Sequence, residues 1–465
     1  MAIFSSLAGF FQRNKRRIFI TSAVTLSVYL IVNEFVIKKF RNYQNALRQE
    51  LMFKQQIKQR FIQTQQDCYY TILALLPVLA GPIIDASPVE LITQALKLKK
   101  GQQPPQNVPA PAQAAPNGHN SELTADNLNL LDNNNNPESK LSFYMNKSKV
   151  ELWDLLKIKT ITRTLTLMYA TSGLLLVTRL QLNILARRSY LESAILMAGV
   201  KHPNNDIDPH ENYIIEQSYL SLSWWLLNKG WVNISSLIEA IVVNKFEKIT
   251  PKTEIGLVEF EVILSDIIGE INTNNKELIL ANLFPINYPD LLETVLNTNP
   301  DLIHHLDIPD SNLTKLINET NSIMLDNNLY FFDLFNSLVM TDLHILTTNL
   351  STSLANTSNS LVMSGTLPEK SPKITEIPIR TFKLASFLAQ LSVQNGIMAN
   401  NNEPRDEEEN DEDDIENILN NLNNMQGGGM SSNSSDELAG NAYINTLHKL
   451  DELDDFSAGI YSNFE

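Results

Sequence analysis

Residues 147–185 read KSKVELWDLLKIKTITRTLTLMYATSGLLLVTRLQLNIL, and this block decides the fold class. It has no proline and only one glycine, a composition that favours helix over strands joined by turns. Its most apolar part, Thr164–Thr178, lies between Arg163 and Arg179. Fifteen helical residues span only about 22 Å, which is too short to cross a bilayer comfortably. We therefore expect one long, well-buried helix here, with a second membrane span as the less favoured alternative.

The rest of the chain has the same helical character. Among its 465 residues, 43% are hydrophobic and only 16 are glycine. Four long stretches contain no proline: 1–76, 138–202, 210–250 and 310–367. This composition predicts an all-α fold, a large bundle of long helices. No repeat of fixed period is present in the sequence, which disfavours a helical solenoid.

Apolar residues three or four apart place the individual helices. One helix is predicted over 40–76 and is expected to end at Pro77. The final element, 442–461, has apolar residues at helical spacing and is expected to dock into the core. Further helices are expected at about 141–198, 213–247, 256–272, 288–297, 311–324, 328–348 and 378–398, with 350–375 as a loop.

A second apolar run, Ile18–Ile37, reads IFITSAVTLSVYLIVNEFVI. Twenty helical residues rise about 30 Å, the thickness of a hydrocarbon core. Basic residues flank both of its ends, which argues against a buried soluble helix. No small-residue cleavage site follows Val36, which argues against a removed signal peptide. We predict a single transmembrane anchor at 18–37, preceded by a short basic segment at 1–17.

The remaining chain, 40–465, is expected to form the helical body with two flexible insertions. The first, 101–140, holds five prolines and the asparagine run 133–136. The second, 400–440, contains the acidic run Asp406–Asp414. Neither has enough apolar residues to order itself. A solvated loop is the favoured interpretation of the acidic run, and an acidic interaction tail is the alternative.

Charge is distributed unevenly along the chain. Residues 1–60 carry eleven Lys and Arg against two Glu, which leaves −25 for the remainder of a −16 chain. The acidic body argues against nucleic acid as a partner, and the basic end suits an anionic membrane surface. The single cysteine, Cys68, excludes an internal disulfide and favours a reducing compartment. A core position is favoured for Cys68 over a reactive thiol.

Catalytic signatures are missing from the sequence. It has no phosphate-binding glycine loop, no dinucleotide fingerprint, no nucleophile elbow and no HExxH motif. The only close histidine pair is His304–His305, and adjacent helical residues point to different faces. The sequence therefore gives no indication of an enzyme, a bound metal or a cofactor.

One stretch has the character of a binding surface. Trp153 lies at the start of the long helix, directly after the flexible insertion. An indole at the end of a bundle can anchor a partner helix that lies in a groove. From the residues alone, this interpretation and an ordinary core position are equally supported. Core positions are expected for Trp224, Trp225 and Trp231, whose surroundings are apolar.

Several blocks together resemble the fungal peroxisomal biogenesis factor 3 (peroxin-3) family. They are FKQQIKQRFIQTQQDCYYTILALLP (53–77), the 147–185 block, YIIEQSYLSLSWWLLNKGW (213–231) and LDDFSAGIYSNF (453–464). The basic N-terminal segment and the anchor fit the same family. These blocks cover about a third of the chain in the expected order, whereas the insertions at 101–140 and 400–440 depart from the family pattern.

The resemblance implies a docking receptor in the peroxisomal membrane, with most of the chain in the cytosol. The family binds a soluble chaperone, biogenesis factor 19, which carries newly made membrane proteins. The chaperone's amphipathic helix inserts into a groove to which a KxxxW pattern contributes. Here that pattern falls on Lys149 and Trp153, with Leu156 one turn further. The resemblance implies that Trp153 supplies the aromatic anchor and Lys149 pairs with an acidic group. It also implies a targeting role for Arg13, Lys15, Arg16 and Arg17.

Other functions stay open at this point. The family also resembles a platform for organelle inheritance and pexophagy adaptors, so a structural tether is the main alternative. A mitochondrial outer-membrane receptor would share the anchor pattern, and a membrane-bound enzyme is least favoured.

Overall fold

The computed structural model describes residues 19–29, 38–101, 137–197, 209–326, 330–362, 381–400 and 440–462. The chain divides into two compact units, residues 1–66 and residues 67–465. Helix α2 (Lys38–Ala86) belongs to both units, because the division falls within it.

The first unit contains a short apolar helix, Phe19–Tyr29, and the first part of α2. The short helix covers eleven residues of the predicted anchor, and residues 30–37 lie outside the described part. Eleven helical residues rise only about 16 Å, so a single-pass anchor at 18–37 stays a prediction. Leu47 and Leu51, expected on a packing stripe, are exposed.

The expectation that α2 ends at Pro77 is wrong. The helix continues through Pro77 and Pro82 to Ala86. Proline removes one backbone hydrogen bond and strains the preceding turn. Both prolines lie on the exposed side of α2, while Leu76, Leu79 and Ile83 are buried in the main core. Burial of these side chains outweighs the local proline penalty, as tertiary packing commonly does in helices.

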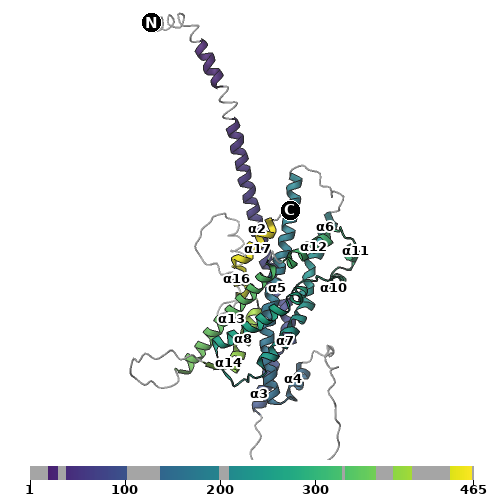
Figure 1. Ribbon diagram of the computed structural model, residues 1–465, viewed down its shortest axis with the longest axis vertical. Coiled ribbons are helices and arrows are strands. Elements are labelled where there is room, and N and C mark those ends of the chain that lie inside the picture. The colour runs from purple at the N-terminus through teal and green to yellow at the C-terminus, as the bar shows by residue number, and fades with distance from the viewer. Residues whose placement is uncertain are drawn as a thin grey trace, which may run out of the picture. The chain divides into compact units, whose positions relative to one another are not determined.

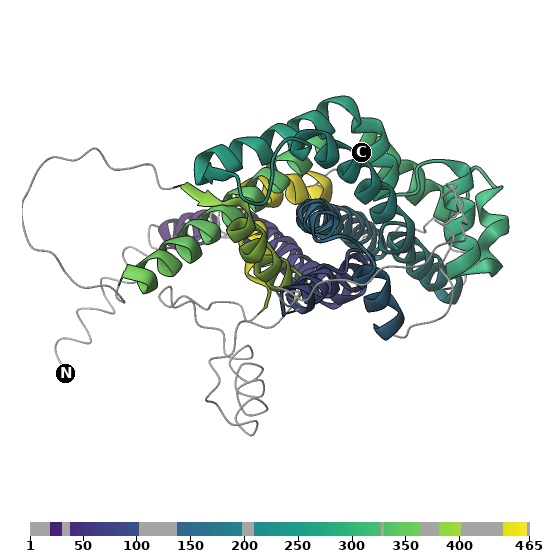
Figure 2. The same ribbon diagram turned by 90° about the horizontal axis from the view of Figure 1, so that it is seen from below.

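The second unit is built around α5 (Lys149–Met197). Every residue from Thr160 to Gln181 is buried, so the long buried helix is confirmed. Figure 1 shows α5 running through the length of the unit, and Figure 2 shows other helices around it. Its main neighbours are α3 (Val89–Gly101), α7 (Trp231–Phe246), α13 (Phe331–Val362), α14 (Leu384–Ala399) and α17 (Asp451–Ser462).

Three helical stretches among the described residues are long and apolar enough to cross a membrane: Leu51–Lys100, Lys149–Ile195 and His210–Phe246. In the second stretch, 94% of the most apolar window is buried inside the protein. Its apolar residues are thus already covered by other helices, which disfavours the alternative of a membrane span at Thr164–Thr178.

The predicted helix over 213–247 is divided into several elements. Residues 209–246 form α6 (Pro209–Leu220), the 3-10 turn η3 (Ser221–Ser223), the π turn η4 (Leu226–Gly230) and α7. A Cβ on Gly230 would lie 1.9 Å from the backbone oxygen of Asn282, so only glycine permits this close approach. Trp225 and Trp231 are buried as expected, whereas Trp224 is partly exposed.

The remaining helices complete an architecture that is helical apart from one small sheet, which confirms the predicted bundle of long helices. They are α4 (Pro137–Met145), α8 (Leu257–Asn274), α9 (Lys276–Leu283), α10 (Tyr288–Thr298), η5 (Pro300–Leu302), α11 (Ile303–Leu306), α12 (Asn312–Leu325) and α16 (Ala442–His448). The loop predicted at 350–375 is wrong over 350–362, because α13 continues to Val362. A small antiparallel sheet, absent from the sequence predictions, pairs β1 (Glu254–Gly256) with β2 (Thr381–Lys383).

The C-terminal helices dock into the core, as their apolar spacing predicted. Leu447, Leu453 and Ile460 are buried in the main hydrophobic cluster. The fully buried guanidinium of Arg179 on α5 donates a hydrogen bond of 3.0 Å to Asp454. It also contacts the His448 ring nitrogen at 2.8 Å. The contacts tie α16 and α17 to the middle of α5. Cys68 is also buried, in agreement with the favoured core position.

Candidate functional site

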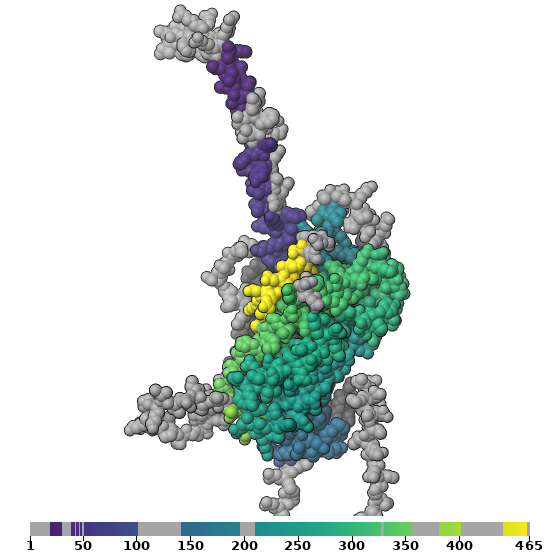
Figure 3. All heavy atoms as spheres, viewed as in Figure 1, coloured from purple at the N-terminus to yellow at the C-terminus, as the bar shows by residue number. Residues whose placement is uncertain are grey.

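A small apolar cluster, separate from the main core, joins α3, α4 and the start of α5. Its buried members are Val89, Ile92, Ala95, Leu96, Leu152 and Leu156. Partly buried residues packed against it are Leu141, Tyr144, Met145, Trp153 and Leu155. In Figures 1 and 3 these elements form the lower end of the second unit. We call this region, residues 89–101 and 141–156, the α3–α5 end.

A capping box fixes the residue at which α5 begins. The backbone N–H of Glu151 donates to the Ser148 hydroxyl at 3.2 Å, and the backbone N–H of Ser148 donates to the Glu151 carboxylate at 2.7 Å. This reciprocal pair satisfies donors that the first turn of a helix leaves unpaired. With the start fixed, Lys149, Trp153 and Leu156 fall at positions i, i+4 and i+7 of one helix face.

The predicted binding residues lie at three different depths on that face. Lys149 is exposed, Trp153 is partly buried, and Leu156 is only 7% exposed. Trp153 therefore rests on the small cluster with part of its indole open to solvent. Leu156 lies beneath that surface and belongs to the cluster itself. Of the three side chains, only Lys149 and Trp153 are open to solvent, Trp153 in part.

Two buried cations hold the α3–α5 end in place. The guanidinium of Arg163 makes two hydrogen bonds of 2.9 Å to the Glu90 carboxylate and one of 3.3 Å to the Ser392 hydroxyl. These bonds join α5 to α3 and α14. Such bidentate pairs fix geometry as well as charge. Sequence reasoning missed the pair, because Glu90 and Arg163 are 73 positions apart and no local pattern connects them.

The second cation, Lys157, ties α5 to the end of α7. Its ammonium donates to the backbone oxygens of Phe246 and Ile249, each at 2.9 Å. It also pairs with Asp154 at 3.2 Å. The lysine thus adds a charged donor to two backbone carbonyls at and just after the end of α7. Because α5 is held on both sides just after Trp153, the indole is presented on a rigid support.

Two lysines lie at the α3–α5 end beside exposed apolar groups. The Lys99 ammonium donates to the backbone oxygen of Lys147, and the Lys147 ammonium lies 4.8 Å from the centre of the Phe143 ring. The ring of Phe143 is 58% exposed. Exposed apolar groups among cations suit a partner that is both apolar and acidic.

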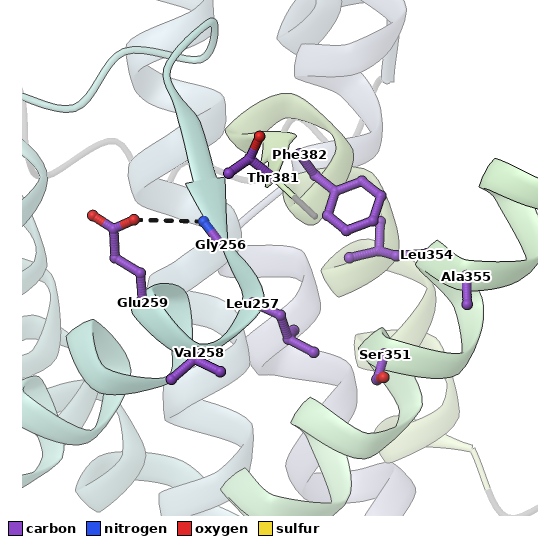
Figure 4. Close-up of a pocket in the computed structure, with 9 residues that line it drawn as sticks. All are labelled: Gly256, Leu257, Val258, Glu259, Ser351, Leu354, Ala355, Thr381 and Phe382. Carbon is purple, nitrogen blue, oxygen red and sulfur yellow. Dashed lines mark hydrogen bonds between the residues drawn. The ribbon is translucent and has the colours of Figure 1, made fainter. Parts of the chain in front are cut away.

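A separate pocket of about 580 Å³ lies beside the β1–β2 sheet. Figure 4 shows its lining from three segments far apart in the sequence: the start of α8, residues 351–355 of α13, and the first residues of β2. Leu257, Leu354 and Phe382 make the lining largely apolar, so it can accept an apolar side chain. None of the predicted binding residues lines this pocket, and sequence reasoning did not find it.

The predicted targeting residues and the acidic run are not described by the structure. Arg13, Lys15, Arg16 and Arg17 lie outside the described residues, as does the acidic run 406–414. Within the described ranges, no group of three or more His, Cys, Asp or Glu is arranged to hold a metal ion.

Comparison with known proteins identifies the family. The Peroxin-3 family model matches residues 9–463. A peroxisomal biogenesis factor 3 from Debaryomyces hansenii is 50% identical over 465 residues, the full length of both chains. The Komagataella phaffii protein named peroxisomal membrane protein PEX3 is 38% identical over 268 residues, 56% of this chain and 57% of that one. The peroxisomal biogenesis factor 3 of Saccharomyces cerevisiae is 27% identical over 498 residues, covering 97% of this chain and 95% of its own. The chain therefore belongs to the peroxin-3 family of peroxisome biogenesis factors.

Proposed function

We propose that this chain is a docking receptor in the peroxisomal membrane. It binds biogenesis factor 19, the soluble chaperone that carries newly made peroxisomal membrane proteins, and so supports their insertion. The proposal combines the family membership with the residues that resemble the family's KxxxW pattern. Binding and release of a helix require no covalent chemistry, which agrees with a non-enzymatic role.

The partly buried indole of Trp153 is the observation that carries this proposal. A tryptophan on a rigid, apolar support can contribute much of the free energy of helix binding without reorganising on contact. Lys149, one turn earlier on the same face, is placed to attract an acidic residue of the incoming helix. In this proposal, the lysines of the α3–α5 end face the acidic side of an amphipathic helix, and the apolar cluster under Trp153 faces its apolar side.

Membrane attachment is part of the same proposal. The single anchor at 18–37 holds the receptor in the bilayer, and the basic residues at 13–17 direct it to the peroxisome and contact anionic lipid headgroups. The helical body then lies in the cytosol, where the chaperone can reach the α3–α5 end.

Substitution of Trp153 tests the proposal. In Trp153→Ala, the affinity for a peptide of the chaperone's N-terminal helix should fall at least about 30-fold, equivalent to about 2 kcal/mol, because an anchoring side chain is lost. Calorimetry measures the affinity, and far-UV circular dichroism checks the fold.

Trp224→Ala is the matched control, because Trp224 is a partly exposed tryptophan on a different element. It should leave the affinity unchanged. Equal affinities of the wild type and Trp153→Ala, with both folded, would refute the proposed binding site.

A second candidate function is a tether for inheritance or pexophagy adaptors. The pocket beside β1 and β2 favours it, because this is an apolar surface separate from Trp153. Cells that lack the protein separate the two functions. Loss of peroxisomal membranes supports the import receptor, and normal but mis-segregated peroxisomes support the tether.

A further inference from the structure

The first turns of α2 carry an exposed apolar stripe. Its members are Phe40, Tyr43, Leu47 and Leu51, whose side chains are between 47% and 67% exposed. Their spacing of i, i+3, i+7 and i+11 places them on one face of the helix. The next apolar residues, Met52 and Phe53, fall on other faces, so the one-sided pattern ends at Leu51. We call these four residues the α2 stripe.

Basic residues flank the α2 stripe on both sides. At about 100° per residue, Lys39 falls about 85° to one side of the stripe, and Arg41 and Arg48 fall about 95° to 115° to the other. All three are exposed. The one acidic residue in the sequence between 39 and 51 is Glu50. An apolar face bordered by cations is the pattern of helices that lie in the surface of an anionic membrane.

We propose that residues 39–51 form an interfacial helix that lies along the surface of an anionic bilayer. The α2 stripe enters the boundary between the headgroups and the acyl chains, and the flanking cations reach the lipid phosphates. The chain thereby gains a second, lipid-dependent attachment beside the predicted anchor. This inference rests on the membrane attachment in the proposed function, and it concerns no residue of the α3–α5 end.

The length of α2 favours this orientation over an upright one. Leu51 lies 14 residues beyond the predicted end of the anchor at residue 37. In a helix perpendicular to the bilayer, it would stand about 21 Å above the hydrocarbon core. The headgroup layer is only about 5 to 8 Å thick on each side. A helix along the surface holds all four side chains at one depth, so this orientation covers the whole stripe.

Charge favours lipid over a second copy of the chain as the occupant. Two anchored copies would pair their stripes in parallel, and opposite flanks of the two helices would then face each other. These flanks carry Lys39 on one side and Arg41 and Arg48 on the other, so cations would face cations. Like charges in this arrangement are destabilising, whereas anionic headgroups neutralise them.

Single-cysteine probes on the full chain test the inference. Phe40→Cys, Leu47→Cys and Leu51→Cys each carry a fluorophore, and the unsubstituted chain measures background labelling of the buried Cys68. In vesicles of phosphatidylcholine with about 30 mol% phosphatidylserine, nitroxide lipids should quench all three probes to a similar extent. Quenching that declines steeply from 40 to 51 shows an upright helix and overturns the inference.

Asn45→Cys is the matched control, because residue 45 is exposed on the opposite face of the same helix. Its probe should be quenched at least about 3-fold less than the probe at 47, since only the stripe enters the bilayer. Equal quenching at 45 and 47 overturns the inference. Far-UV circular dichroism checks that each labelled variant is folded.

Neutralisation of the flanking cations tests the part that anionic lipid plays. The triple substitution Lys39→Gln, Arg41→Gln, Arg48→Gln should reduce quenching at 47 at least about 3-fold and remove its dependence on phosphatidylserine. Quenching that is equally strong in phosphatidylcholine alone, and unchanged in the triple variant, overturns the assignment to anionic lipid.

Two further measurements separate the alternatives. Disulfide cross-linking between Leu47→Cys chains, strong in detergent and indifferent to lipid, would assign the stripe to a second copy and overturn the inference. The affinity for the chaperone-helix peptide should be unchanged in the triple variant, because the substituted residues lie outside the α3–α5 end. If the wild type does not bind that peptide while the quenching pattern holds, the proposed receptor function fails and the interfacial helix stands.

Discussion

Two parts of the same helix, the middle and the first two turns of α5, meet opposite requirements. From Thr160 to Gln181 every residue is buried, and the polar groups of Ser172 and Arg179 have partners inside the protein. Over Lys149–Leu156, exposed, partly buried and buried residues alternate. The middle therefore contributes to stability, and the first turns present side chains to solvent without losing support from below.

The polar residues show this difference most clearly. In the middle of α5, Ser172 donates to the buried carboxylate of Asp342 at 3.1 Å, and Arg179 pairs with Asp454. Lys149, in the first turn, is exposed. Removing a buried charge leaves its surroundings uncompensated, whereas an exposed charge is readily replaced by water. Substitutions in the two parts should therefore have very different effects on stability.

The largest effect is expected for Arg179→Ala. Loss of this buried guanidinium removes the bonds to Asp454, Ser457 and His448, and should lower the free energy of unfolding by about 3 to 5 kcal/mol. Denaturant unfolding of the detergent-purified full chain, followed by circular dichroism, measures the change. Arg188→Ala is the control, because this arginine on the same helix is partly exposed and pairs with the exposed Glu192 one turn away. Equal losses of unfolding free energy in Arg179→Ala and Arg188→Ala would contradict the proposed difference between buried and exposed parts of α5.

A change of the opposite sign is expected for Asp342→Asn. Burial raises the pKa of Asp342 to about 8, against the opposing hydrogen bond from Ser172. The folded protein therefore binds a proton that the unfolded chain, with a pKa of about 3.9, releases above that pH. The contribution of Asp342 to stability should therefore fall as pH rises from about 4 to 8. Asparagine needs no proton, so Asp342→Asn should raise the free energy of unfolding by about 1 to 4 kcal/mol at neutral pH.

The pH profile is the measurement for this second prediction. The stability of Asp342→Asn relative to the wild type should increase between about pH 4 and pH 8, while Asp333→Asn, at an exposed position on the same helix, should show no such increase. If the stability gained by Asp342→Asn over the wild type does not grow between about pH 4 and pH 8, the Asp342 carboxylate is not held in its protonated form and the prediction fails.

The smallest effect on stability is expected for Lys149→Glu. An exposed residue in the first turn should change the free energy of unfolding by less than about 0.5 kcal/mol. Its effect should instead appear in binding, because a repulsive charge replaces an attractive one, and the loss should shrink as salt is raised. Calorimetry at two salt concentrations provides the check. A large loss of stability would mean that the first turn belongs to the core.

The sequence near the start of α5 predicted the positions of the candidate binding residues along the helix, but not how deeply each of them is buried. The tryptophan near the start of a long helix is visible in the sequence, so a candidate anchor could be identified. The single helix predicted over 141–198 is wrong at its start, because α4 ends at Met145 and the Ser148–Glu151 capping box begins α5 at Lys149. The depth of Trp153 could not be predicted, because it depends on α3 and α4, which pack against it. Leu156 shows the same limit: its spacing places it on the binding face, but the small cluster covers it.

Errors in helix length have a related cause. Pro77 is a local signal for a helix end, and the Ser/Thr/Asn-rich stretch after residue 350 is a local signal for a loop. In the structure, both helices continue past these signals. Leu79 and Ile83 beyond the proline are buried in the main core, and so are Leu350 and Leu354 on α13. Burial against distant helices outweighed the local preferences of these segments.

The sequence by itself determined the helical class, the buried central helix, the family and the uneven charge, because each depends on composition or on residues close together in the chain. Only the tertiary structure decided that Trp153 is partly exposed, which apolar residues it packs against and how Arg163 and Lys157 hold the start of α5. The physical reason is that burial and ion pairing depend on contacts between segments 70 or more positions apart, such as Glu90 with Arg163 and Lys157 with Phe246.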